Sequence, residues 1–233
     1  MMAVQTLYKL VILSETGKKY TTNGAGTWGD CSFRGLSSFS ASNGNAHVLV
    51  CDPINGDTYY VLLPDGNGVW KSTNAGATWT RQTSTSPYPS VLPTNYLDGA
   101  QMSAVPGQAA HLFIAGGKGC GKALARSVDG GRTWAAVGNI TEAWQVSAGA
   151  TRPSGTYPSV FMVGIIQGDS DPGVFRADDC TGNPLDKPTW ARVARAPAGN
   201  MDTSNKLFAD LDTYGTFYLT MSSTGYCWGE LDR

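Results

Sequence analysis

The sequence predicts an all-β protein, a β-propeller built of four-stranded antiparallel blades, on two observations. First, one eight-residue segment recurs: Ser127-Val-Asp-Gly-Gly-Arg-Thr-Trp134 has a near copy in Ser72-Thr-Asn-Ala-Gly-Ala-Thr-Trp79, and altered copies begin at residues 21 and 177. Successive copies therefore lie about fifty residues apart, which is the length of one propeller blade. Second, short runs rich in Val, Ile, Phe and Tyr precede every copy, and no long window shows a helical period.

The expected order within each unit is strand, turn, strand, Gly-rich hairpin, strand, Asp-containing turn and strand. We expect a single domain over residues 1–233 that holds about four to five blades and is therefore an incomplete propeller. No first strand is expected before residue 7, and no Asp-containing turn is expected at the end of the last unit. The approximate blades are 6–33, 40–83, 99–138, 143–195 and 200–230.

The composition agrees with short strands joined by tight turns. The 233 residues include 29 Gly, 7 Trp and 10 Tyr, only 15% are charged, and the net charge is −1. Gly supplies the positive φ that tight turns need. A charge so near zero, without a run of Lys or Arg, argues against nucleic acid or a membrane as partner. No segment has the pattern of a signal peptide or a membrane span, so the residues themselves assign no location.

The residues that most often bind metals form no recognisable motif. His47 and His111 each stand just before a predicted strand, a position that is more often structural than ligating. The five cysteines show no CxxC spacing, so we expect no metal site and leave their disulfide pairing open.

Residues 116–122, Gly-Gly-Lys-Gly-Cys-Gly-Lys, match the phosphate-binding pattern of Gly, four residues, Gly and Lys. A phosphate loop must be followed by a helix, because the helix N-terminus and the loop amides together hold the anion. Here residues 124–126 are predicted as a strand, and Ala123 replaces the Ser or Thr that would bind magnesium. We therefore interpret the segment as a hairpin between the second and third strands of its blade, and expect no cofactor.

The recurring turn has a predicted structural role. Its Asp or Asn can accept hydrogen bonds from the backbone amides ahead of it, its Gly permits a left-handed residue, and its Trp can bury a large apolar surface. Asn74 occupies the position of Asp129, and an uncharged amide could not replace a general acid. The structural residues of the two best copies are Ser72, Asn74, Gly76, Thr78, Trp79, Ser127, Asp129, Gly131, Thr133 and Trp134.

This turn resembles the Asp-box, or bacterial neuraminidase repeat, and its flanks resemble the repeats of family 74 glycoside hydrolases. The segment Val50-Cys-Asp-Pro-Ile-Asn-Gly-Asp-Thr-Tyr-Tyr60 is similar to the xyloglucanase repeat. Residues 150–164 with 173–178 resemble the penultimate blade of the second propeller in these enzymes, and residues 213–219 with 223–229 resemble their closing segment. The likeness runs over nearly the whole chain and is most specific in the last ninety residues.

The resemblance implies a function in polysaccharide degradation. Enzymes of this family have two seven-bladed propellers with a glucan cleft between them, and they cleave β-1,4-glucan chains, typically xyloglucan, with inversion. One Asp in each propeller is catalytic, and the two serve as general acid and general base. The two carboxyl groups of an inverting pair must stand roughly 6.5–9.5 Å apart to admit a water molecule. No segment matches the family motif around the second-propeller Asp. Asp98 is the nearest analogue, and its alternative interpretation is a turn residue before Gly99. The resemblance also implies a secreted protein.

Trp144 and Tyr157 are the candidate platforms for sugar rings, because the C–H faces of sugars pack on aromatic faces. The alternative for each is a buried contact within or between blades. The family's aromatic stretch before the closing blade is altered here, since residues 199–203 contain no Trp.

Two functions remain open on the sequence. The first is a polysaccharide-active module, a fragment or shortened relative of a xyloglucanase that lacks a complete catalytic pair, so that catalysis by this chain is uncertain. The second is a non-catalytic, sortilin-like propeller that binds a protein or a glycan. A sialidase is disfavoured, because Arg152-Pro153 alone does not supply its arginine cluster. Open sheet edges could pair with another propeller domain or with a second copy, unless the N-terminal strands close a small ring.

Overall fold

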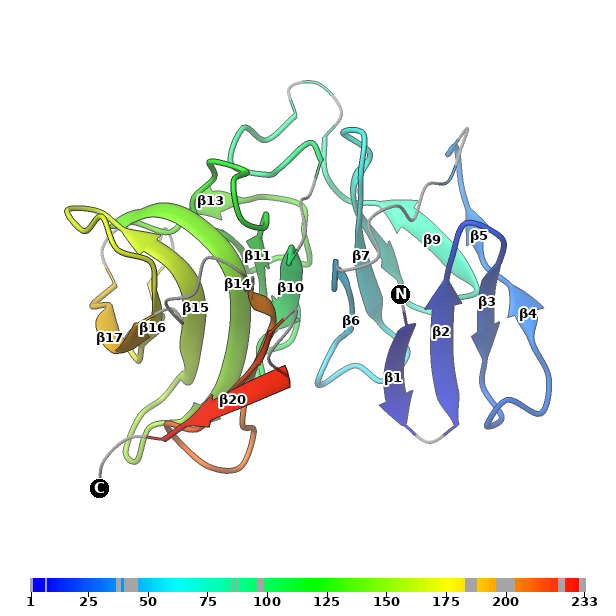
Figure 1. The fold of residues 1–233 in the computed structure, drawn as a ribbon. Coiled ribbons are helices and arrows are strands. Elements are labelled where there is room, and N and C mark those ends of the chain that lie inside the picture. Colours follow the sequence, from blue (N-terminus) through cyan, green and yellow to red (C-terminus); the bar gives the residue numbers. More distant parts are fainter. Residues whose placement is uncertain are drawn as a thin grey trace.

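In the computed structural model of the protein, the described residues form twenty strands arranged in an arc of five sheets (Figure 1). The described part contains no helix, and so none that is long and apolar enough to cross a membrane. The all-β fold class is confirmed. The structure describes residues 2–6, 8–36, 39, 46–84, 86, 88–95, 99–182, 188–195, 204–221 and 225–230.

Consecutive strands within each sheet form an antiparallel meander, which we call a blade, and we number the blades 1 to 5 in chain order. Blade 1 contains β1 (Met2–Thr6), β2 (Lys9–Leu13), β3 (Lys18–Thr21) and β4 (Gly29–Asp30). Blade 2 contains β6 (Leu49–Cys51), β7 (Tyr59–Leu63), β8 (Gly68–Ser72) and β9 (Thr78–Arg81). Blade 3 contains β10 (Gln101–Ala104), β11 (Leu112–Ala115), β12 (Ala125–Ser127) and β13 (Ala135–Ala136).

The last two blades carry the longest strands of the protein. Blade 4 contains β14 (Ile140–Thr151), β15 (Pro158–Ile166), β16 (Gly173–Ala177) and β17 (Ala191–Arg195). Blade 5 has three described strands, β18 (Ser204–Ala209), β19 (Phe217–Met221) and β20 (Gly225–Gly229). The order within the blades agrees with the strand order expected from the repeats, so the chain is an incomplete β-propeller.

The start of the chain differs from the expectation. No first strand was expected before residue 7, and this is wrong, because β1 pairs in antiparallel fashion with β2. The end of the predicted first unit also leaves its blade. The short strand β5 (Ser32–Phe33) pairs in parallel with β9 of blade 2, and the Phe33 ring stacks on Trp79 with a centroid distance of 5.1 Å.

The first strands of successive blades lie side by side around the axis of the arc: β1 by β6, β6 by β10, β10 by β14 and β14 by β18. Between blades 2 and 3 the backbones are joined directly just before β6. The amide of His47 donates to Ala100 O at 2.8 Å, and the amide of Met102 donates to His47 O at 2.8 Å. The first strands therefore form a nearly continuous inner wall.

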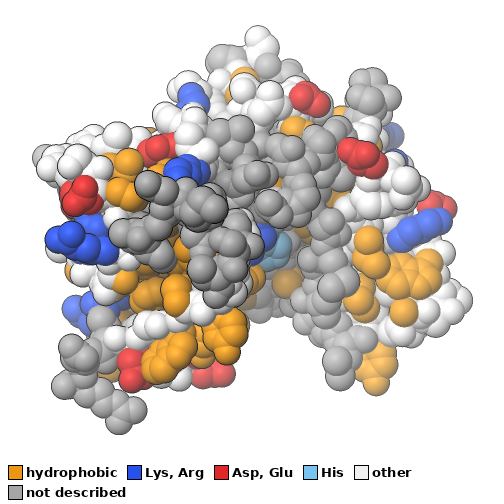
Figure 2. Space-filling view, viewed as in Figure 1, with side chains coloured by type: hydrophobic (Ala, Val, Ile, Leu, Met, Phe, Trp, Pro, Cys, Tyr) orange, Lys and Arg blue, Asp and Glu red, His pale blue; other side chains and the backbone are white. Residues whose placement is uncertain are grey.

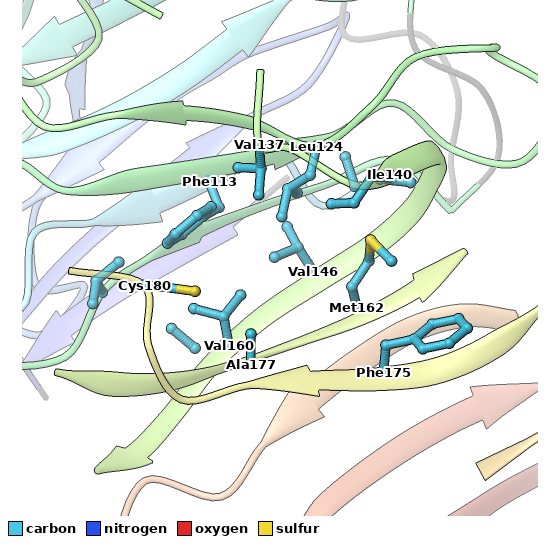
Figure 3. Packing of buried hydrophobic residues seen from close by; sticks show 14 of the residues in the cluster. Phe113, Leu124, Val137, Ile140, Val146, Val160, Met162, Phe175, Ala177 and Cys180 are labelled. Atoms are coloured by element: carbon cyan, nitrogen blue, oxygen red, sulfur yellow. The ribbon is translucent and has the colours of Figure 1, made fainter. Parts of the chain in front are cut away.

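The core lies between the blades rather than inside one sheet. Figure 3 shows the cluster between blades 3 and 4, in which Phe113 and Leu124 of blade 3 face Val146, Val160 and Met162 of blade 4. All five side chains are fully buried. Burying one such side chain contributes about 1.5–3 kcal/mol, so each blade is stabilised mainly by the faces that its neighbours cover.

Candidate functional site

A groove runs along the inner wall, and its lining comes from four blades. Its volume is about 400 Å³. We call it the axial groove. In Figure 2 the surface is hollowed between the sheet that ends in β20 and the sheet that begins with β1. The lining residues are His47, Leu49, Val50, Cys51, Pro53, Gln101, Met102, Ser103, Ala104, Pro106, Ser147, Ala148, Phe208, Ala209 and Leu211.

Two buried glutamines fix the position of β18 at the groove. Gln101 Nε2 donates to Leu207 O at 2.6 Å, and the amide of Leu207 donates to Gln101 Oε1 at 3.1 Å. Gln145 Nε2 donates to Ser204 O at 2.9 Å, and Ser204 Oγ donates to Gln145 Oε1 at 2.7 Å. Each amide side chain thus satisfies both a donor and an acceptor of β18, which matters because unpaired buried polar groups are costly.

Two serines of the inner wall make similar links. The amide of Ala148 donates to Ser103 Oγ at 3.0 Å, and the amide of Ala209 donates to Ser147 Oγ at 2.9 Å. Ser103 and Ser147 line the groove, but their hydroxyl oxygens already serve a neighbouring blade. The groups that remain for a ligand are therefore mostly apolar, together with His47.

His47 is the main polar group of the axial groove. Its ring lies 6.0 Å from the ring of Phe208, and its buried Nδ1 has no hydrogen-bond partner among the described residues. Burial lowers the pKa of His47, and the positive charge of Lys206 lowers it further. The imidazole is therefore neutral at neutral pH, and a neutral imidazole can donate one hydrogen bond and accept another.

No carboxylate lines the axial groove in the part of the chain that the structure describes. The candidate acid Asp98 lies outside the described residues. An inverting hydrolase needs two carboxyl groups across the scissile bond, one to protonate the leaving oxygen and one to activate water. The described residues of the groove can hold a ligand but do not provide this pair.

Trp144 and Tyr157, the two predicted sugar platforms, both lie away from the groove lining. The exposed fraction is 8% for Trp144 and 5% for Tyr157, so neither presents a free face to solvent. Lys118 Nζ stands 5.1 Å from the centre of the Trp144 ring. The Tyr157 hydroxyl lies 2.9 Å from His111 Nδ1 and accepts from Arg126 Nη2 at 3.2 Å. Their burial agrees with the alternative interpretation, a contact within or between blades.

The side chains of the recurring turns make hydrogen bonds with the backbone of the same turn. In blade 3, Ser127 Oγ accepts from the amide of Gly131 at 2.9 Å, and Asp129 Oδ1 accepts from the amide of Thr133 at 3.0 Å. In blade 2, Ser72 Oγ accepts from the Gly76 amide at 3.0 Å, and Asn74 Oδ1 accepts from the Thr78 amide at 2.9 Å. The indole N–H of Trp79 and of Trp134 donates to the turn glycine's carbonyl, at 2.8 Å and 3.0 Å.

The turn glycines also touch the preceding blade. Gly76 and Gly131 have φ values of 92° and 86°, where a side chain is strained. A Cβ on Gly76 would lie 2.4 Å from Val11 Cγ2, and a Cβ on Gly131 would lie 2.8 Å from Val69 Cγ1. Each turn therefore closes its own blade and packs against the one before it.

The loop of residues 116–122, which matches the phosphate-binding pattern, binds a side-chain carboxylate of the protein itself. The amides of Gly119 and Gly121 donate to Glu142 Oε1 at 2.5 Å and 3.2 Å. The segment connects β11 to β12, as the hairpin interpretation expects, and no helix follows it. Because the carboxylate of Glu142 takes the amides that would face a phosphate, the loop offers no nucleotide site.

Groups of three or more His, Cys, Asp or Glu with metal-binding geometry are absent among the described residues. All five cysteines are free thiols. Burial raises the pKa of Cys31 to about 11 and that of Cys180 to about 12, so these two thiols are protonated and unreactive at neutral pH.

Both the sequence and the structure of the chain are similar to those of known proteins. No protein-family model matches the chain. A xyloglucanase from Paenibacillus sp is 27% identical over 168 residues, which cover 66% of this chain and 16% of that protein. The GH74 enzyme of Niastella koreensis superposes on 95% of this chain with a TM-score of 0.68 and 22% identity. The chain resembles part of a family 74 glycoside hydrolase.

A second solved structure has the same fold. The GH74 xyloglucanase of Xanthomonas campestris superposes on 99% of the chain with a TM-score of 0.68 and 18% identity. The GH74-like chain spans only 29% of each of these two enzymes and 16% of the Paenibacillus protein. The family resemblance seen in the sequence is thus confirmed, for both the sequence likeness and the propeller fold.

Sequence reasoning did not find the groove of this GH74-like chain. Its lining is contributed by the first strands of four blades, and these strands are separated by about fifty residues along the chain. His47 lies just before a strand, as the sequence predicts. Nothing in the neighbouring sequence indicates that it also lines a groove. Phe208 and Leu211 likewise carry no motif that marks them.

Proposed function

We propose that this chain is a polysaccharide-binding propeller unit, similar to part of a xyloglucanase, that takes a β-linked glucan in the axial groove. The likeness to a xyloglucanase carries the proposal, because it indicates the class of ligand. The axial groove supports it by offering a place where a chain of sugar rings can lie across four blades.

The chemistry of the groove suits a sugar. Pyranose rings have apolar C–H faces, which can pack on Phe208, Leu211 and the proline rings of the lining. Their hydroxyl groups need hydrogen-bond partners, and the neutral imidazole of His47 in the lining can offer one. A mostly apolar groove with one or two well-placed polar groups is typical of small-molecule sites.

Hydrolysis would need more than this groove. We retain Asp98 as the proposed carboxylate of this chain, and the second member of the inverting pair would come from another propeller. If a second copy of the chain supplies that propeller, the purified chain should release product from xyloglucan and Asp98→Asn should not. Product that forms equally in both would remove Asp98 from the reaction.

The binding proposal is tested by titrating the full chain with cellohexaose and with xyloglucan in a calorimeter. Leu211 is 64% exposed at the groove, and Leu211→Arg should block it sterically and weaken both ligands by about tenfold or more. Tyr8, also 64% exposed, lies in blade 1 outside the groove, so Tyr8→Arg is the matched control and should bind normally. Failure of the unmodified chain to bind either glucan would overturn the proposed function.

A further inference from the structure

A second pocket lies at the outer edge of blade 4, whereas the axial groove runs along the inner wall. We call it the edge pocket, and its volume is about 340 Å³. It is bordered by Trp190, which directly precedes β17, the outermost strand of this blade (Figure 1). Blades 3 and 5 flank blade 4 on its two sides, so the pocket belongs to the interior of the repeat array. The described lining residues are Asn139, Ile166, Gln167, Pro188, Thr189 and Trp190.

Trp190 has an equivalent in each of the two blades before it. In blades 2, 3 and 4 a tryptophan stands at the end of the recurring turn, and the residue after it pairs with a basic residue of the third strand. These pairs are Thr80 with Lys71, Ala135 with Arg126 and Ala191 with Arg176. Trp79, Trp134 and Trp190 therefore occupy the same position in their blades, and the surroundings of the three indole rings can be compared directly.

The first two of these indoles are covered by the segment that enters their blade. In blade 2, Phe33 of the entering segment 31–48 lies parallel to Trp79, with ring centroids 5.1 Å apart and an angle of 6° between the ring planes. In blade 3, side chains of the entering segment 82–100 pack in the same cluster as Trp134, and these are Tyr88, Val91 and Leu92. The protein thus places its own rings and aliphatic groups against these two tryptophans.

The segment that enters blade 4 is too short to do the same. It consists of residues 137–139, between β13 and β14, and three extended residues span at most about 10 Å. Trp190 is accordingly half-buried and borders the edge pocket. Its Nε1 is buried and has no partner among the described residues, so the part of the ring that remains exposed is apolar carbon surface.

Polar but uncharged groups stand around this ring. The amide of Gln167 donates to Asn139 O at 2.9 Å, which holds the two residues together at one side of the pocket. Their side-chain amides have no hydrogen-bond partner among the described residues, so each can donate to a ligand and accept from it. No Lys, Arg, Asp or Glu is present in the described lining. The pocket therefore suits a neutral ligand that has both an apolar face and hydroxyl groups.

We propose that the edge pocket is a second polysaccharide-binding site, in which one sugar ring of a neutral glucan packs on Trp190 and its hydroxyl groups bind the side chains of Asn139 and Gln167. The proposal rests on the proposed function and adds a site on the outer edge of the propeller. The sugar would take the place that Phe33 has on Trp79, because the C–H face of a pyranose packs on an indole much as another ring does. The pocket has a volume near the lower end of the range for ligand sites, so it suits a short stretch of the polymer.

The edge pocket is tested in the Leu211→Arg variant, in which the axial groove is blocked. Affinity electrophoresis in gels that contain xyloglucan measures the polymer affinity, and Leu211→Arg should retain weak binding. Adding Trp190→Ala should lower this remaining affinity by about tenfold, because a packed aromatic contact is worth about that factor. Adding Trp134→Ala instead is the matched control, since it removes the equivalent indole where protein side chains already cover it, and it should leave the remaining affinity unchanged.

Gln167 is exposed, so Gln167→Ala is the second variant if Trp190→Ala does not fold. It should lower the remaining affinity by about threefold through the loss of hydrogen bonds. If Leu211→Arg no longer binds xyloglucan, or if Trp190→Ala and Gln167→Ala leave its remaining affinity unchanged, the edge pocket is wrong and the groove proposal stands. Full affinity in Leu211→Arg that disappears on adding Trp190→Ala supports the edge pocket and refutes the groove. An unmodified chain that binds no xyloglucan refutes the proposed function, and this site with it.

Discussion

At the scale of single residues, the recurring turn has the same geometry with a carboxylate side chain as with an amide side chain. Asp129 Oδ2 accepts from Thr133 Oγ1 at 2.6 Å, whereas Asn74 Nδ2 donates to Thr78 Oγ1 at 2.9 Å. The threonine hydroxyl can donate or accept, so it adapts to either partner. Asp129 Oδ1 and Asn74 Oδ1 each accept from the backbone amide of the threonine in their own turn. The charge of Asp129 is therefore not required by the hydrogen bonds of the turn.

We predict that Asp129→Asn changes the free energy of unfolding by less than about 0.5 kcal/mol at pH 7, while Asp129→Ala costs about 1–2 kcal/mol through lost hydrogen bonds. Urea unfolding monitored by tryptophan fluorescence measures both. A loss in Asp129→Asn as large as that in Asp129→Ala would show that the charge itself stabilises the turn.

The unmodified chain and Asp129→Asn should differ in stability at acidic pH. Burial raises the pKa of Asp129, but the hydrogen bonds from Thr133, Ser127 and Arg132 outweigh it, and the pKa lies below its ordinary value of 3.8. A depressed pKa stabilises the fold above about pH 4, and this stabilisation disappears as the pH falls through the folded-state pKa. The unfolding midpoint of the unmodified chain should therefore drop more steeply below pH 4 than that of Asp129→Asn. Parallel pH profiles would contradict this.

At the scale of elements, the hairpin between β11 and β12 is ordered by a carboxylate from the next blade. Glu142 belongs to β14, and its Oε1 accepts from the amides of Gly119 and Gly121. The position of residues 116–122 within the repeat predicted a hairpin. The contact with the Glu142 carboxylate could not be predicted, because Glu142 stands more than twenty residues after Gly119 and Gly121 and lies in another sheet. Local pattern identifies an element, and contacts between sheets depend on how the elements pack.

Removing this carboxylate should loosen the hairpin. We predict that Glu142→Ala raises the hydrogen-exchange rate of the Gly119 and Gly121 amides by about tenfold, which corresponds to one hydrogen bond of roughly 1.4 kcal/mol. NMR-detected exchange measures each amide separately. Glu142→Gln keeps an acceptor oxygen and should retain most of the protection. Unchanged exchange in Glu142→Ala would show that the two amides are protected by other groups.

At the scale of the whole molecule, the blades are coupled to their neighbours by buried faces and by a few side-chain amides. Gln101 reaches from blade 3 to the backbone of Leu207 in blade 5, and Gln145 reaches from blade 4 to Ser204. Both glutamines are fully buried. Blade 5 is thus held by polar links to two other blades, in addition to the apolar cluster that it shares with blade 4.

We predict that Gln101→Leu destabilises blade 5 selectively, because it leaves the amide and the carbonyl of Leu207 buried without their partner, at a cost of about 2–4 kcal/mol. Hydrogen exchange by mass spectrometry should show faster exchange in β18 and β19 than in β2. Gln82→Leu, which removes only a surface link to Thr80 O, is the control and should exchange normally. Uniform exchange across all blades in Gln101→Leu would contradict a local effect.

The propeller was predictable at this scale because its signal is repeated. Copies of one turn about fifty residues apart fix the number and order of the sheets. Strand β1 was missed, since its sequence Met-Ala-Val-Gln-Thr carries little β pattern by itself and is defined by pairing with β2. The burial of Trp144 and the exposure of Trp228 could not be told apart either, because an aromatic residue in a strand does not reveal which face a neighbour covers.

Because Asp129 and Asn74 form equivalent turns, exchanging Asp for Asn at this position can change the isoelectric point of the protein without changing its fold. With a net charge of −1, a single exchange of Asp129 for Asn would bring the chain to neutrality. Further exchanges of the same kind could adjust solubility to a more acidic or a more saline medium. Ionic character and architecture are thus separable in this molecule, and homologues could diverge widely in the first while conserving the second.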